Sequence, residues 1–293
     1  MDKINKVLFQ VKYQKDKNWL KVKKLLLETI SEYPENAQLY QALAELYFSK
    51  KLYSKAIGAY TRLREIDKTD QEIPFKIANC FLSLREYKLA IDYYESSPII
   101  FQELLYNKAY AYSRLGDYEQ SIEIMKQLVK YPINSELPLI FLAELYFTQS
   151  NYHQAILYLN KAERMFGKQS TIFYLRGIAY SHLERWLKAY WEFKYADQMK
   201  MVNHHLYRGY GIACDKIGKT AEAIDLLLQS IKLSPKNTAG YLDLIRIYLE
   251  NNRVMEAYTI IQHARKNLPA SISLTLLYNQ IMQKMENLSR KNN

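Results

Sequence analysis

Apolar residues in this sequence recur with the spacing of paired helices. The clearest case is segment 37–70, whose apolar positions lie three or four residues apart on either side of a polar break at 50–53. This spacing predicts two amphipathic helices joined by a short turn, which is a helical hairpin. The small residues Ala44 and Ala56 fall where the two helices would cross, because short side chains let helix axes approach closely. Tyr47 and Tyr60 would fill the flanking space.

The hairpin pattern returns along nearly the whole chain. Positions equivalent to Ala56 recur every 34 residues, with a single interval of 31. One hairpin cannot bury its own apolar faces, so we expect stacked copies that share a continuous core. The equivalent residues are Val22, Ala90, Ser121, Ala155, Ala189, Ala223 and Ala257.

A second small position and a set of prolines complete the pattern. The small residue of the first helix recurs as Ala78, Ala109, Ala143, Gly177 and Gly211, and Pro34, Pro132, Pro235 and Pro269 stop the second helix. With the 34-residue period, these residues resemble the tetratricopeptide repeat family over about residues 3–271. The resemblance implies an all-α fold, an α-solenoid of about eight antiparallel hairpins in a right-handed superhelix with a C-terminal capping helix.

The period divides the chain into eight repeats and a last helix. The first repeat is degenerate and rich in lysine, which suits a cap whose outer face meets water. After the repeats we expect a capping helix over 272–288 and a disordered tail over 289–293. The repeats span 3–36, 37–70, 71–101 (shortened), 102–135, 136–169, 170–203, 204–237 and 238–271.

The shortened repeat predicts an irregular joint at Ser96–Pro98. There a serine could cap the next helix and Pro98 could occupy its first turn. The joint is either a hinge or a kink in a rigid array, and we favour the kink. Ser135, Ser170 and Asn203 are candidate caps of later first helices.

The family resemblance also implies a binding surface. In tetratricopeptide proteins the first helix of each repeat lines a concave groove. Each first helix here carries one stripe of residues that packs inside the hairpin and a second stripe, polar and aromatic, on another face. The second stripe would face a bound peptide. Carried onto this sequence, the candidate peptide-binding residues are Phe75, Asn79, Tyr106, Asn107, Tyr110, Arg114, Phe141, Glu144, Tyr174, Arg208 and Arg246.

This candidate groove changes character along the chain. From Phe75 to Tyr174 it is aromatic, which suits an extended or helical peptide with apolar anchors. These rings could equally pack between adjacent first helices. Arg208 and Arg246 could receive acidic groups of a ligand or pair with acidic residues of the chain, and we favour internal pairing.

One subgroup of the family binds the C-terminal carboxylate of heat-shock chaperones through lysine, asparagine and arginine side chains. Asn79 and Asn107 match two of those positions, but Phe75, Leu137 and Phe141 stand where the cations should be. A buried carboxylate would then lack partners. We therefore expect no chaperone-tail clamp.

Motifs for chemistry are missing from the sequence. The five histidines and two cysteines have no metal-ligand spacing, and no phosphate loop or nucleophile motif occurs. We expect no enzyme activity, no cofactor and no metal, with Cys80 and Cys214 as small core residues. No apolar run reaches the length of a membrane span, and no signal-peptide core precedes the repeats, so we expect a cytoplasmic monomer without membrane insertion.

The net charge of +11 is spread unevenly. Residues 1–36, 170–237 and 238–293 are basic, whereas 102–169 is neutral, which argues against a continuous phosphate-binding stripe. The leading hypothesis is a scaffold or adaptor that binds a partner protein. The alternatives are a receptor for a short signalling peptide and, third, an RNA-binding repeat protein, which would need base-reading residues in register.

Overall fold

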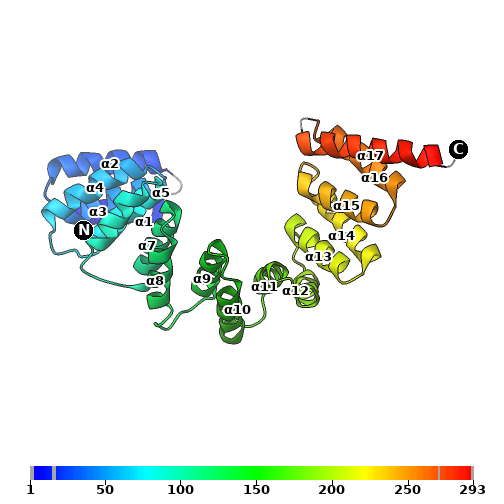
Figure 1. The fold of residues 1–293 in the computed structure, drawn as a ribbon. Helices are drawn as coiled ribbons and strands as arrows, with labels where there is room; N and C mark the ends of the chain where they lie inside the picture. Colours follow the sequence, from blue (N-terminus) through cyan, green and yellow to red (C-terminus); the bar gives the residue numbers. More distant parts are fainter. Residues whose placement is uncertain (1–2, 15–17, 270, 292–293) are drawn as a thin grey trace. The chain divides into compact units, whose positions relative to one another are not determined.

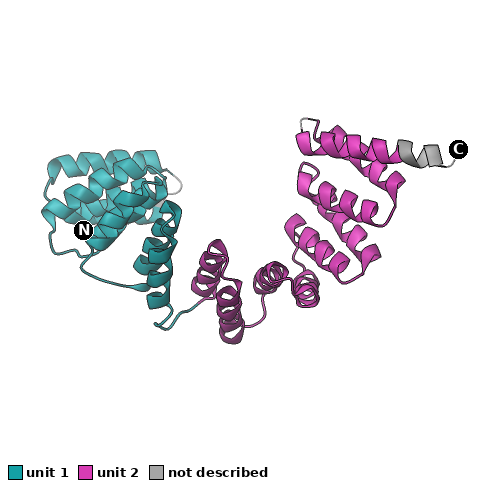
Figure 2. Ribbon diagram, in the orientation of Figure 1, with its two compact units in different colours: residues 1–134 teal, residues 135–293 magenta. Residues whose placement is uncertain are grey.

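The structure, a computed structural model, describes residues 3–14, 18–269 and 271–291. It divides into two compact units, unit 1 with residues 1–134 and unit 2 with residues 135–293 (Figures 1 and 2). The described residues form 17 α-helices and no strand. The all-α prediction is therefore confirmed.

Unit 1 consists of four helical hairpins, in which each first helix packs against the second helix that follows it. Successive hairpins also touch, because each second helix contacts the first helix of the next hairpin. The helices are α1 (Lys3–Gln14), α2 (Trp19–Glu32), α3 (Ala37–Ser49), α4 (Tyr53–Ile66), α5 (Ile73–Ser83), α6 (Tyr87–Glu95), α7 (Gln102–Leu115) and α8 (Tyr118–Leu128).

Unit 2 continues the same arrangement with four further hairpins and a final helix that packs on the last one. The sequence predicts that final helix over 272–288, and the structure continues it to Lys291. The helices are α9 (Leu137–Thr148), α10 (Tyr152–Phe166), α11 (Ser170–His182), α12 (Trp186–Gln198), α13 (His204–Lys216), α14 (Thr220–Leu233), α15 (Thr238–Glu250), α16 (Val254–Asn267) and α17 (Ile272–Lys291).

The small residues that define the period are buried inside the hairpins. Ala44 and Ala56 are 0% exposed, as are their counterparts Ala109 and Ser121 in α7 and α8. The Ser121 hydroxyl donates a hydrogen bond of 2.7 Å to the Ala109 carbonyl, so a polar residue is accommodated at a crossing point without an unpaired group. These residues therefore set the close approach of the paired helices.

Each first helix from α3 to α15 ends in the same left-handed turn. In the first of these turns Leu52 donates its backbone N–H to the carbonyl of Tyr47 at 2.9 Å, and an equivalent bond closes every later one. This bond satisfies a carbonyl at the helix end that has no partner within the helix. In these seven turns the residues with positive φ are Lys51, Arg85, Gly116, Ser150, Glu184, Gly218 and Asn252. They are spaced along the chain by the same intervals as the sequence repeats.

These turns allow a stability prediction, because most of them hold a residue other than glycine. Glu184 has a φ of 54°, and a left-handed conformation costs an L-residue roughly 1–2 kcal/mol. We expect Glu184→Gly to raise the free energy of unfolding by about 1 kcal/mol and Gly116→Ala to lower it by a similar amount. Urea unfolding followed by circular dichroism measures both. A less stable Glu184→Gly variant would contradict the argument.

The joint after the shortened repeat differs from our interpretation. Helix α6 ends at Glu95 and α7 begins at Gln102, with Phe101 as its N-cap. Ser97 and Pro98 therefore lie in the connection before α7, so Pro98 is not in its first turn. No serine caps this helix, because its N-cap residue is Phe101 and no side chain bonds to the exposed backbone N–H groups.

Of the three predicted caps, only one holds. The Asn203 side chain accepts a hydrogen bond of 2.8 Å from the backbone of His205 and caps α13. Ser135 precedes the N-cap Glu136 of α9, and Ser170 is already the first residue of α11, so both of those predictions were wrong.

Candidate functional site

The candidate residues of α5 take part in packing within unit 1. The Phe75 side chain is 9% exposed, and its ring centroid lies 4.7 Å from that of Phe101. The Asn79 side-chain oxygen accepts hydrogen bonds from Tyr94 Oη at 2.5 Å and from Asn107 Nδ2 at 3.0 Å. The two asparagines that match the chaperone-binding subgroup are therefore bonded to each other.

The end of α7 is more open to solvent. Tyr106 is half-buried, whereas the Tyr110 side chain is 39% exposed. Arg114 is exposed, with its guanidinium 5.8 Å from the centroid of the Tyr87 ring. Tyr110 and Arg114 are thus the candidate residues of α7 that are most open to a partner.

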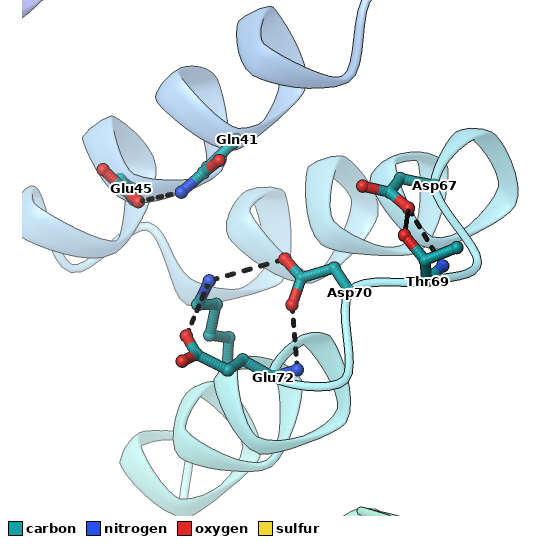
Figure 3. Close-up of polar contacts among 7 residues, drawn as sticks. Gln41, Glu45, Asp67, Thr69, Asp70 and Glu72 are labelled. Carbon is teal, nitrogen blue, oxygen red and sulfur yellow. Dashed lines mark hydrogen bonds and ion pairs between the residues drawn. The ribbon is translucent and has the colours of Figure 1, made fainter.

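Polar side chains on α3 and α5 are held by local contacts (Figure 3). Gln41 Nε2 donates to Glu45 Oε1 at 3.0 Å within α3. At the start of α5, Lys76 Nζ lies 3.3 Å from Glu72 Oε2 and 3.7 Å from Asp70 Oδ2. Each of these polar side chains therefore already has a partner within the chain.

In unit 2, helix α9 presents Phe141 and Glu144 on its second stripe. Phe141 is half-buried, and Glu144 is exposed. The surrounding protein nevertheless displaces enough water to raise the pKa of the Glu144 carboxyl above its ordinary value. A cation from a ligand would find this carboxylate less strongly hydrated than one on an open surface.

Two candidate residues, Tyr174 of α11 and Arg208 of α13, line the same pocket in unit 2. The pocket has a volume of 380 Å³ and is formed by residues of α11, α12 and α13. Burial raises the pKa of the Tyr174 hydroxyl above its ordinary value, so this group stays a neutral hydrogen-bonding group even in basic solution. The lining residues are Tyr174, Ile178, Ser181, His182, Trp186, Phe193, His205, Arg208, Gly209 and Ile212.

The ring of Phe193 separates α11 from α13 beside this pocket. Phe193 is 1% exposed, and a β-carbon built on Gly177 would lie 2.5 Å from its ring. A β-carbon on Gly209 would lie 2.9 Å from the same ring. Only residues without a side chain fit on both sides, so the two glycines allow the first helices to close on the phenyl group.

Sequence reasoning identified part of this pocket and missed the rest. It placed Tyr174 and Arg208 on the second stripe but did not select Trp186 or Phe193, because both belong to the second helix of the repeat. The one available signal was Gly177, which is smaller than the alanine found at most equivalent positions. A smaller residue there indicates a large neighbour.

The arginines of the last repeats are paired within unit 2. Arg208 Nε lies 2.6 Å from Asp243 Oδ2, and Arg246 Nη1 lies 3.3 Å from Asp215 Oδ2 and 3.0 Å from Glu250 Oε2. The prediction of internal pairing is confirmed. Both arginines remain partly exposed, so pairing orients them without removing them from the surface.

Other chemically active groups do not assemble into a site in the part of the chain that the structure describes. There, no three side chains of His, Cys, Asp or Glu are placed to hold a metal ion. Cys80 and Cys214 are buried, and burial raises the pKa of each thiol to about 12, so neither is an activated thiolate. None of the described helices is long and apolar enough to cross a membrane.

Comparison with known proteins gives the chain its family. Residues 102–132 and 218–281 match models of the tetratricopeptide repeat. Stacked antiparallel hairpins already define an α-solenoid. With these two matches and the 34-residue period, the chain is a tetratricopeptide repeat protein. No curated protein matches the sequence significantly.

Solved structures share the fold at low sequence identity. The C-terminal part of a TPR repeat-containing protein from Cytophaga hutchinsonii is 18% identical, with a TM-score of 0.66 over 79% of this chain and 96% of that one. A tetratricopeptide repeat protein from Parabacteroides merdae is 16% identical, with a TM-score of 0.61 over 84% and 98%. The APC/C hetero-tetramer Cut9–Hcn1 is 17% identical, with a TM-score of 0.57 over 89% of this chain. This chain spans only 52% of that one.

Proposed function

We propose that this protein is a non-enzymatic scaffold or adaptor, a cytoplasmic monomer that binds a partner protein or peptide along its first helices. The observation that carries the proposal is the pocket of 380 Å³ in unit 2, which has aromatic walls and is lined by residues of the first helices α11 and α13 and of α12. Pockets of this kind bind ligands through apolar walls and a few polar groups. The exposed Tyr110 and Arg114 offer further contacts in unit 1.

The fold supports binding better than catalysis. A solenoid devotes its buried residues to contacts between neighbouring repeats and presents a long surface to partners. The similar Cut9–Hcn1 structure is itself a hetero-tetramer. Aromatic side chains such as Tyr110 and Tyr174 give a large contact area with little rotamer entropy to lose, as expected of interface anchors.

Site-specific photo-crosslinking in the source cell tests the proposal. A photoreactive phenylalanine analogue would replace Tyr110 or Tyr174 on first helices, and Trp191 on the second helix α12 as the control. Trp191 is a suitable control because it is 46% exposed and does not line the pocket. We expect a discrete protein adduct from positions 110 and 174 and none from position 191.

The same cells allow a binding test with simpler variants. The double variant Tyr110→Ala, Tyr174→Ala should reduce the amount of partner that co-purifies with the chain at least tenfold. The reason is that loss of two aromatic anchors weakens the binding free energy by about 2 kcal/mol or more. Trp191→Ala should leave recovery unchanged. Equal adducts from positions 174 and 191 would contradict binding along the first helices, and adducts with RNA would favour the nucleic-acid alternative.

A further inference from the structure

The pocket between α11 and α13 combines apolar walls with hydrogen-bond donors and has no acidic side chain on its lining. Its walls include Tyr174, Trp186 and Phe193, with Ile178 and Ile212 completing the apolar part. The only residues on its lining that can carry a charge are one arginine and two histidines, and none is acidic. An apolar group that bears a negative charge therefore matches the lining better than a neutral or cationic one.

Arg208 is held in position for such a charge. Its Nε donates to Asp243 Oδ2 at 2.6 Å, and its side chain remains 36% exposed. Among the hydrogen bonds of the described residues, none involves the two terminal nitrogens of this guanidinium. A carboxylate in the pocket could accept from both of them, and hydrogen bonds between charged groups are about twice as strong as neutral ones.

The two histidines offer additional donors. The His182 ring stacks on the Tyr152 ring with centroids 4.5 Å apart, which fixes its orientation beside the pocket. Burial lowers the pKa of His205, and the neighbouring His204 and Arg208 lower it further, so the ring is neutral at pH 7. The neutral His205 ring can donate one N–H to an incoming carboxylate.

We infer that this pocket binds an aromatic side chain of the partner that has an acidic residue directly beside it in the sequence. The aromatic ring takes the space against Phe193 and Trp186, and the neighbouring carboxylate takes the donors of Arg208. The volume of 380 Å³ lies at the lower end of the range for ligand pockets, about 300–1,000 Å³, which suits one anchoring side chain. The inference rests on the proposed function and names the chemistry of its ligand.

Peptides with a fluorine label test the inference on the full chain. The acidic peptide is a blocked pentapeptide with 4-fluorophenylalanine between two aspartates. The amide peptide, used for comparison, has asparagine in place of both aspartates. Fluorine NMR measures the binding of each peptide. We expect the acidic peptide to bind at least tenfold more tightly. Arg208→Gln should remove that difference, whereas Arg208→Lys, which keeps the charge, should retain part of it.

Arg253→Gln is the matched control, because Arg253 is also a partly exposed arginine of unit 2 paired with a carboxylate, that of Glu256, but does not line the pocket. It should leave the affinity for both peptides unchanged. Equal binding of the acidic and amide peptides, or an Arg208→Gln variant that is folded by circular dichroism and binds normally, would overturn the inference. Tighter binding of free 3-phenylpropionate than of the peptide would also overturn it, in favour of a small aromatic acid.

The peptide experiment and the crosslinking experiment can fail independently, so a failure of the ligand chemistry can be told apart from a failure of the proposed function. A partner that crosslinks at position 174 while the acidic peptides fail to bind refutes the ligand chemistry alone. Peptide binding that depends on Arg208, without any protein adduct at positions 110 and 174, refutes the scaffold alone.

Discussion

Replacement of Arg176 with alanine is expected to lower the free energy of unfolding by about 3–5 kcal/mol. Arg176 is 7% exposed in the interior of unit 2, where its guanidinium lies 2.5 Å from Glu163 Oε2 and 2.9 Å from Glu192 Oε2. The Asn160 side chain accepts a further hydrogen bond at 2.8 Å. Removal of the cation leaves two partly buried carboxylates close together, each with a desolvation cost that nothing offsets.

Arg62 provides the control, because it also pairs with two carboxylates but on an exposed surface. Its nitrogens lie 2.8 Å from Glu35 and 2.8 Å from Glu65, and its side chain is 42% exposed. We expect Arg62→Ala to lower the free energy of unfolding far less than Arg176→Ala does, since exposed ion pairs contribute little. Urea unfolding followed by circular dichroism compares the two variants, and similar losses would contradict the argument.

The loss caused by Arg176→Ala should depend on pH. Burial raises the pKa of Glu192, and the neighbouring Arg176 opposes that rise. Without the cation the folded-state pKa rises further above the unfolded value, so the folded state binds a proton more readily as the pH falls. The difference in stability from the unaltered chain should therefore be smaller at about pH 5 than at pH 7.5.

Arg176 also shows what the sequence could and could not predict. Residue 176 lies three residues after Phe173 and next to Gly177, so helical spacing alone places it on the face that packs inside the hairpin, and the residue is buried there. Its two carboxylate partners lie 13 and 16 residues away on α10 and α12. Spacing fixes which face a residue occupies, but not which side chains from neighbouring helices converge on it.

The same limit applies to the candidate site. Helical periodicity was sufficient to find the hairpins and their small crossing residues, because those features depend on one repeat at a time. The pocket of unit 2 depends on residues of two successive repeats and on Trp186 at the start of a second helix. No pattern within one repeat predicts that Phe193 would stand between two glycines and leave space beside it.

Two glycine-to-alanine substitutions should change stability in opposite directions. In α4, Gly58 is exposed and a β-carbon there would have no heavy atom within 4 Å. Gly58→Ala should therefore raise the free energy of unfolding by roughly 0.5–1 kcal/mol, since alanine is the better helix former. In α11, a β-carbon on Gly177 would lie 2.5 Å from the buried ring of Phe193. Gly177→Ala should therefore lower the free energy of unfolding by about 1–3 kcal/mol or more.

The cause of the second effect can be isolated with a double variant. If the clash with Phe193 is responsible, Gly177→Ala combined with Phe193→Leu should be more stable than the sum of the two single changes predicts, because the smaller side chain makes room for the new methyl group. Urea unfolding of the four chains in this cycle gives the coupling energy. Additive effects would show that the ring does not set the distance between α11 and α13, and the pocket beside Phe193 would then owe its width to other contacts.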